Sequence, residues 1–212
     1  MKPFSAAVFD LDGTLLNSLG VWKEVDNAFL TKRGIPVPPD YQTAISSMSM
    51  RETADYTIAR FSLPDTPDDL IAEWLDMAKT AYATTVDIKP YAKEYLQKLH
   101  RGGIPLAVAT SSAEELFLPA LERNGVKDLF STFVTTGQVG RGKNFPDVYL
   151  EAARRLGVSP DQCAVFEDVL AAIKVARQAG FYTVAVQDGY SPEEEPLRGS
   201  ADEYITSYEE LS

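Results

Sequence analysis

The strongest constraint on the fold is an alternation of apolar runs with helical patterns over the second half of the chain. Four segments rich in apolar residues are interpreted as buried strands: residues 106–109, a strand around 133–134, 163–166 and 183–186. A short edge strand is also expected at residues 204–205. Strands that alternate with helices predict an α/β fold, in which a doubly wound parallel sheet is covered by helices on both faces.

Another apolar run lies close to the N-terminus and ends in two acids. Residues 6–9 read Ala-Ala-Val-Phe, and Asp10-Leu11-Asp12-Gly13-Thr14 follow directly. The run is too short for a signal peptide or a membrane span, so we interpret it as a buried strand. Residues two apart on an extended segment point the same way, so Asp10 and Asp12 can face one ligand.

The intervening region has helical periodicity and no convincing strand. Trp22, Val25 and Phe29 recur at helical spacing, and Thr66 followed by Pro67 is typical of a capped helix start. We therefore expect a helical insertion at residues 16–86. The core is then made of residues 1–15 and 87–212.

Composition narrows the classes of partner. Thirty-one Asp and Glu residues against twenty Lys and Arg give a net charge of −11, which argues against nucleic acid and against an anionic membrane surface. Cys163 is the single cysteine, so no internal disulfide can form, and no stretch approaches a membrane-spanning length. We expect a cytoplasmic protein, a monomer or weak dimer, with a small ligand. The acidic run 193–195 is interpreted as a solvated loop.

Chemically active side chains gather where the expected strands end. In open parallel sheets, ligands bind outside the carboxyl ends of the strands. The strand ends and one nearby loop deliver acids, hydroxyls and a lysine: Asp10, Asp12, Thr110, Ser111, Lys143, Glu167 and Asp168. The next residue, Ser112, is expected to cap the following helix.

These residue types fit phosphoryl transfer with a bound cation. Four neighbouring carboxylates repel one another unless a cation is present, and oxygen ligands without His or Cys favour Mg²⁺. Asp10 can act as the nucleophile, and Asp12 can protonate the leaving oxygen. Thr110 precedes a helix N-terminus that favours an anion, and Lys143 can neutralise charge on the transferred group.

Four segments in this order resemble the motifs of the haloacid dehalogenase (HAD) superfamily. They are Phe9-Asp10-Leu11-Asp12-Gly13-Thr14-Leu15, Val108-Ala109-Thr110-Ser111, Gly142-Lys143 with Pro146-Asp147, and Val165-Phe166-Glu167-Asp168. The resemblance covers essentially the whole chain. It implies a Rossmann-like core, and the insertion resembles the α-helical cap of the phosphoglycolate phosphatase-like and β-phosphoglucomutase-like branch.

The resemblance also implies a set of metal ligands. They are the carboxylates of Asp10 and Asp168 and the backbone carbonyl of Asp12, with Glu167 behind them or binding through water. It further places several residues of the cap opposite the phosphate: Ser18, Trp22, Met48, Met50 and Arg51. Each of these could equally belong to the cap interior or surface. Ser111, Ser18 and Arg51 are the substrate contacts we predict, Arg51 as a second anion contact.

The leading hypothesis is a Mg²⁺-dependent phosphatase that acts on a small phosphorylated metabolite through an aspartyl-phosphate. A sugar-phosphate mutase is the first alternative, although β-phosphoglucomutases carry a histidine where Trp22 falls here. A non-catalytic phospho-receiver domain is the second, and Asp12 argues against it because a receiver needs no leaving-group acid. Residues 137–143 match the spacing of a nucleotide-binding P-loop, but Asn144 replaces the Ser or Thr that binds Mg²⁺.

Overall fold

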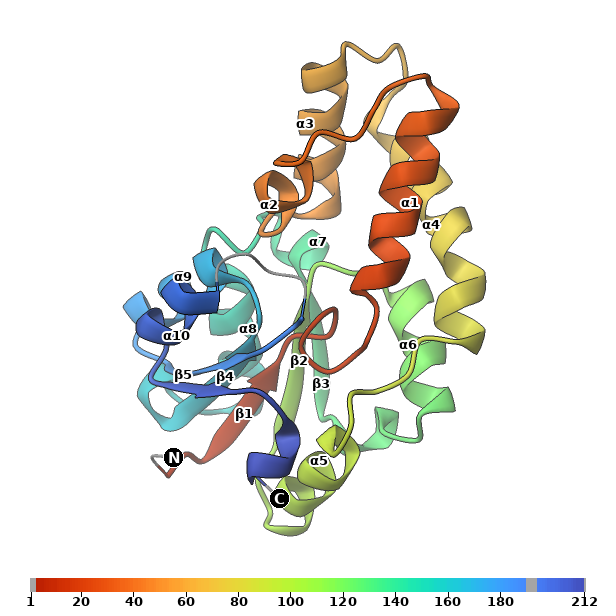
Figure 1. Cartoon of the computed structure of the whole chain (residues 1–212). Coiled ribbons are helices and arrows are strands. Elements are labelled where there is room, and N and C mark those ends of the chain that lie inside the picture. The colour runs from red at the N-terminus through yellow and green to blue at the C-terminus, as the bar shows by residue number, and fades with distance from the viewer. Residues whose placement is uncertain (1–2, 190–193, 212) are drawn as a thin grey trace.

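The computed structural model describes residues 3–189 and 194–211 and contains a parallel sheet (Figure 1). Its six strands follow the order β3-β2-β1-β4-β5-β6. They are β1 (Ala6–Phe9), β2 (Leu106–Thr110), β3 (Thr132–Thr135), β4 (Cys163–Glu167), β5 (Tyr182–Val186) and β6 (Glu203–Ile205). Every pairing is parallel. The α/β, Rossmann-like class is confirmed, as is the edge strand at residues 204–205.

Alternate residues of the central strand point to opposite faces of the sheet. Ala7 and Phe9 pack with α5 (Ala92–Arg101) and α6 (Glu114–Arg123) on one face. Ala6 and Val8 pack with α8 (Asp147–Leu156) and α9 (Leu170–Gln178) on the other. Because both faces are covered, all four residues of β1 are fully buried, which explains the uninterrupted apolar run in the sequence. Two short helices, α7 (Thr136–Val139) and α10 (Glu194–Ser200), complete the core.

Four helices form the insertion and stand beyond the carboxyl ends of the strands (Figure 1). They are α1 (Leu19–Lys32), α2 (Tyr41–Ile45), α3 (Met50–Phe61) and α4 (Pro67–Thr84). The Thr66 side chain accepts the backbone N–H of Asp69, as expected for a capped start with Pro67 in the first turn. No helix in the described ranges is long and apolar enough to cross a membrane.

Two local predictions were wrong. Ser112 does not cap α6, because the helix begins one residue later and its N-cap is Ala113, which has no side-chain capping bond. The acidic run near the C-terminus is not a loop where it is described, because Glu194 and Glu195 open α10. Its first residue, Glu193, lies outside the described residues.

The two connections between the insertion and the sheet lie against each other. Leu16 forms an antiparallel bridge with Ile88, and the Asn17 backbone N–H donates to the Asp87 carbonyl over 2.9 Å. The chain therefore enters and leaves the insertion at one place. That arrangement sets α1 and α4 over the strand ends that carry the acids.

Candidate active site

Two neighbouring strands deliver carboxylates at the point where the strand order reverses. Phe9 of β1 pairs with Phe166 of β4, so Asp10, directly after β1, lies beside Glu167, the last residue of β4. The backbone N–H of Asp10 donates to the Phe166 carbonyl over 3.0 Å, which fixes the two side chains in register. Chain segments diverge to either side of β1 here, and such switch points are the usual ligand sites of this architecture.

Lys143 joins these two acids from the loop before α8. Its ammonium group donates to Asp10 Oδ1 and to Glu167 Oε1, and all three side chains are buried. Burial opposes the charge on the lysine, but the two carboxylates outweigh that penalty and raise the pKa of Lys143. The lysine therefore holds a fixed positive charge beside the Asp10 carboxylate.

The carboxylates of Asp10, Glu167 and Asp168 each place an oxygen within 4.8 Å of the others, and all three residues are buried. The pKa of Asp10 is raised to about 7, chiefly by burial and against the opposing charge of Lys143, and the charge of Glu167 contributes to this rise. Burial, then the charges of Glu167 and Asp10, raise the pKa of Asp168 well above its ordinary value. Lys89 lowers the pKa of Asp168 by its charge, but that pKa stays well above its ordinary value, so Lys143 and Lys89 together do not neutralise the cluster. The oxygen donors of the cluster suit a hard divalent cation such as Mg²⁺.

The oxygens of Glu167 are already engaged by protein donors. Oε1 accepts from Lys143 and from the Tyr149 hydroxyl at 2.9 Å. Oε2 accepts the backbone N–H groups of Asp168 and Val169 at 2.9 and 3.0 Å. These contacts suit Glu167 to support the lysine and the turn after β4 rather than to bind a cation directly.

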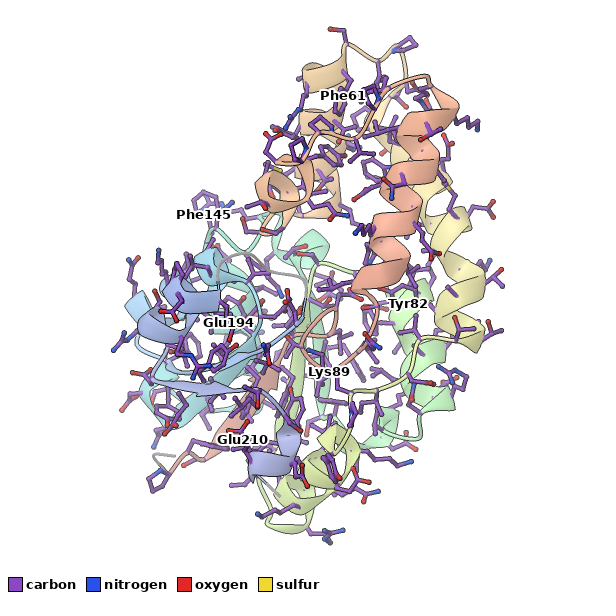
Figure 2. The ribbon with its side chains drawn as sticks, in the orientation of Figure 1. Phe61, Tyr82, Lys89, Phe145, Glu194 and Glu210 are labelled. Atoms are coloured by element: carbon purple, nitrogen blue, oxygen red, sulfur yellow. The ribbon has the colours of Figure 1, made fainter. Side chains whose placement is uncertain are left out.

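Asp168 is positioned by the turn that follows β1. The Thr14 hydroxyl donates to Asp168 Oδ1 over 2.7 Å. Gly13 has φ +83°, and a Cβ there would lie 2.2 Å from Asp168 Oδ2, so both the backbone and the carboxylate require glycine. Lys89, labelled in Figure 2, donates to the carbonyls of Gly13 and Gln187 and ties this turn to the chain after β5.

Asp12 is held by the helical insertion. The Ser18 hydroxyl donates to Asp12 Oδ1 over 2.6 Å, and the Tyr82 hydroxyl donates to the same oxygen. Trp22 in turn donates its indole N–H to the Tyr82 oxygen over 2.7 Å. Figure 2 places Tyr82 at the end of α4 that faces the sheet. Both donors act on Oδ1, so the described residues leave Oδ2 without a hydrogen-bond partner.

Tyr82 is one of the residues of this site that sequence reasoning missed, together with Thr14, Lys89 and Tyr149. Its spacing from Trp74 and Ala78 on α4 is that of a buried helical face, and all three are indeed buried. The sequence could have indicated this contact only through the Tyr82 hydroxyl at the end of that face, because a buried phenol usually has a polar partner. Burial, followed by the negative charge of Asp12, raises the pKa of Tyr82 well above its ordinary value.

A cavity of about 480 Å³ extends from the acidic cluster into the insertion. Asp10, Asp12, Thr110, Ser111 and Lys143 all line it. Thr110 is fully buried and its hydroxyl accepts the backbone N–H of the residue two positions on, over 3.0 Å. The buried Ser111 hydroxyl has no hydrogen-bond partner among the described residues and is free for a ligand.

Of the five residues of the insertion that were expected to face the phosphate, three line the cavity and two do not. Trp22, Met48 and Met50 line the cavity. Ser18 is fully buried behind Asp12 and is not part of the cavity wall. Arg51 is exposed and pairs with Asp68 on α4, so the structure does not bring it to the site. In the sequence, an arginine at the start of a helix looks the same whether it binds a ligand or forms a surface ion pair, so the prediction for Arg51 had no basis for choosing between them.

The fold and this site agree with a family assignment. The family model of haloacid dehalogenase-like hydrolases matches residues 7–186, which include the insertion, strands β2 to β5, all but the first residue of β1, and every acid of the cluster. The chain belongs to this family.

Several relatives of the chain are named as phosphatases. The chain is 31% identical over 193 residues to validoxylamine A 7'-phosphate phosphatase of Streptomyces hygroscopicus subsp. limoneus, covering 90% of this chain and 89% of that protein. It is 29% identical to hexitol phosphatase A of Escherichia coli, covering 97% and 92%. A bifunctional riboflavin kinase/FMN phosphatase of Arabidopsis thaliana is 30% identical over 97% of this chain, which spans about half (54%) of that protein.

Solved structures agree on the fold. CbbY from Rhodobacter sphaeroides in complex with phosphate has a TM-score of 0.83 at 25% identity, covering 99% of this chain and 96% of that one. β-Phosphoglucomutase from Clostridium difficile has a TM-score of 0.84 at 20% identity, covering 99% and 93%. At that identity the second likeness bears on the fold alone.

Proposed function

We propose that the chain is a Mg²⁺-dependent phosphatase that hydrolyses the monoester of a small phosphorylated metabolite. The family and the phosphatase relatives support hydrolysis of phosphoric monoesters. The observation that carries the proposal is the buried contact between Asp10 and Lys143 at the end of β1, with Asp12 lining the same cavity. A nucleophile, a fixed cation and a proton donor are thus available to one phosphoryl group.

In the first step, Asp10 attacks phosphorus through its carboxylate and forms an aspartyl-phosphate. The bond to the ester oxygen breaks, and protonated Asp12 gives its proton to that oxygen from Oδ2. The Tyr82 hydroxyl stays on Oδ1 and keeps the carboxyl group oriented. Lys143 and the free hydroxyl of Ser111 are placed to hold the phosphoryl oxygens.

In the second step, Asp12 is the base. Its carboxylate accepts a proton from water, the resulting hydroxide equivalent attacks phosphorus, and Asp10 is released with inorganic phosphate. The proton lost in the first step is recovered, so the enzyme returns to its starting state.

The acidic cluster is suited to hold the metal ion. The carboxylates of Asp10 and Asp168, together with the backbone carbonyl of Asp12, would bind Mg²⁺. When bound, the ion supplies positive charge beside the phosphoryl oxygens. The raised pKa values of the two carboxyl groups support the need for a cation in addition to Lys143.

We also propose that residues 16–86 act as a cap on a core of residues 1–15 and 87–212. The single attachment point at Leu16 and Ile88 suits a hinge. Movement there would open the cavity to a substrate and close it again without disturbing the sheet.

The insertion also contacts the core at a second place, between Ser47 and the loop that carries Lys143. The Lys143 backbone N–H donates to the Ser47 carbonyl over 2.7 Å, and the Ser47 hydroxyl donates to Asn144 Oδ1 over 2.9 Å. Closure of the cap is thereby linked to the loop that carries the catalytic lysine.

Hydrolysis of p-nitrophenyl phosphate tests the proposal. We expect Asp10→Asn to lower kcat by roughly a thousandfold or more, because the covalent step is lost. EDTA should abolish wild-type activity and Mg²⁺ should restore it. Asp128→Asn, which removes an exposed acid from the core surface, is the matched control and should retain activity. Full activity in Asp10→Asn would refute the proposal.

The same protein preparation separates the two alternative functions. A coupled assay that detects conversion of a β-hexose 1-phosphate faster than phosphate release would favour the mutase. Trp22 argues against it, since its indole donates to Tyr82 and carries no titratable proton for transfer. A receiver domain would release at most one phosphate per chain, so multiple turnover would exclude it.

A further inference from the structure

The cavity reaches well beyond the groups that act on phosphate. One face of α1 lines it at helical spacing, through Leu19, Trp22, Lys23 and Asp26. Its volume of about 480 Å³ lies within the range of sites that enclose a whole small molecule, roughly 300–1,000 Å³. The part inside the insertion therefore has room for the group that carries the phosphate.

The rise per residue of α1 and α4 gives the distance between the part of the cavity inside the insertion and the catalytic acids. Tyr82 contacts Asp12, and Trp74 lies eight residues earlier on α4, which is about 12 Å along the helix at 1.5 Å per residue. Asp26 lies four residues beyond Trp22 on α1, or about 6 Å further from the core. Phe29 of α1 contacts the Trp74 ring at 5.3 Å between centroids, so the two helices are packed together at this end.

Polar groups at this far end are buried and poorly partnered. Asp26 is 8% exposed, and its one described hydrogen bond is a long one of 3.4 Å from the Gln42 amide. Trp74 is 4% exposed, and its indole N–H has no hydrogen-bond partner among the described residues. The Trp74 N–H is therefore an unsatisfied buried donor, and Asp26 is a buried acid with one long hydrogen bond. Both residues line one cavity, and an unsatisfied buried donor disfavours the empty site.

We propose that Asp26, Gln42 and Trp74 bind hydroxyl groups of a sugar or sugar alcohol that carries the phosphate at its other end. A hydroxyl both donates and accepts, so it can satisfy the carboxylate and the indole N–H together. The apolar faces of Trp22 and Trp74 suit the C–H surfaces of such a molecule. The inference rests on the proposed phosphatase function and adds the class of leaving group.

The charges that line the cavity argue against two other classes of ligand, those with a second phosphate and those with a cationic group. A second phosphate would need cations at the far end, but Lys23 is the one basic residue besides Lys143 among the described residues that line the cavity. The carboxylate of Asp26 would repel that phosphate as well. A cationic leaving group would meet Lys23 one helical turn from Asp26. A neutral polyol avoids both conflicts.

The test compares hexitol 6-phosphate with n-hexyl phosphate, a monoester of similar length without further hydroxyls. We expect wild-type kcat/KM to favour the hexitol ester. Asp26→Leu should lower the ratio of the two kcat/KM values by about 10- to 100-fold, the usual worth of a hydrogen bond to a charged group. Trp74→Phe, which keeps the packing but removes the N–H, should lower the ratio by about threefold to tenfold.

Controls separate binding from folding and from loss of the activity itself. Glu24→Leu, which replaces an exposed acid on the same helix, should leave the ratio unchanged. A variant that merely folds poorly should lower kcat/KM for both esters by the same factor, which leaves their ratio unchanged. Asp26→Asn provides a conservative second replacement. An unchanged ratio in all Asp26 and Trp74 variants, or a wild type that does not prefer the hexitol ester, would overturn the inference and leave the phosphatase proposal intact. No hydrolysis of any ester by the wild type would refute both.

Discussion

The Asp26 carboxyl group gives a quantitative prediction of stability. It lies on α1, and burial, opposed by the hydrogen bond from Gln42, raises its pKa from 3.8 to about 6. The folded state therefore holds this proton more tightly than the unfolded chain. The contribution of Asp26 to the free energy of unfolding must therefore fall as pH rises from about 4 to about 6 and stay low above that range. At about 1.4 kcal/mol per pKa unit, the full loss is roughly 3 kcal/mol.

Asp26→Asn removes this ionisation and keeps an oxygen for the Gln42 amide. Relative to wild type, its free energy of unfolding should increase by about 2 kcal/mol more at pH 7.5 than at pH 4.5, because most of the titration falls between these values. Urea unfolding at intermediate pH values measures the trend. Tyr41, whose pKa is raised to about 12 chiefly by burial, stays protonated throughout this pH range in wild type and does not contribute to the trend.

An exposed acid on the same helix provides the control for this measurement. Glu24→Gln changes the net charge by the same amount as Asp26→Asn. A pH trend of equal size in Glu24→Gln would assign the effect to net charge rather than to burial. A difference between Asp26→Asn and wild type that is the same at pH 4.5 and pH 7.5 would refute the reasoning outright.

Three further substitutions test the parts of the site. Tyr82→Phe removes one donor from Asp12, so kcat for p-nitrophenyl phosphate should fall about 10- to 100-fold with little change in KM, and an unchanged kcat would contradict the positioning role. Gly13→Ala should weaken Mg²⁺ binding about tenfold or more in calorimetry, since its Cβ would lie 2.2 Å from Asp168 Oδ2; wild-type affinity would count against that ligand. Gly142→Ala would place a Cβ 2.3 to 2.7 Å from atoms of the insertion, so KM should rise about fivefold through a wedged cap, and an unchanged KM would argue against closure at this contact.

The parts of the fold and site that the sequence predicted are those set by local pattern. The four residues of β1 read as a strand because both of their faces are covered, and the strand ends where Asp10 begins. Parallel strands align their carboxyl ends, so knowing the strands was enough to bring Asp10 and Glu167 to one edge. Lys143 needed the resemblance as well, because its loop has no periodicity of its own.

Contacts between distant segments could not be predicted in this way. Tyr82 is 70 residues from Asp12, and Lys89 is 76 residues from Gly13. Each depends on how the insertion and its return segment settle on the sheet, which a helical pattern does not encode. Arg51 illustrates the opposite error: a basic residue near an expected anion site bonds instead to a neighbouring helix, at Asp68.

Asp26 carried a signal that periodicity alone does not interpret. It lies four residues after Trp22 and three before Phe29, so an acid stands within the apolar stripe of α1. Such a conflict between residue type and position costs stability, and chains retain it chiefly where function requires it. Hydroxyls bound in the cavity would offset the cost, so removal of the carboxylate should raise stability and lower polyol preference together. If an Asp26 variant is more stable than wild type but keeps the same preference for the polyol ester, the buried carboxylate has no role in binding the polyol.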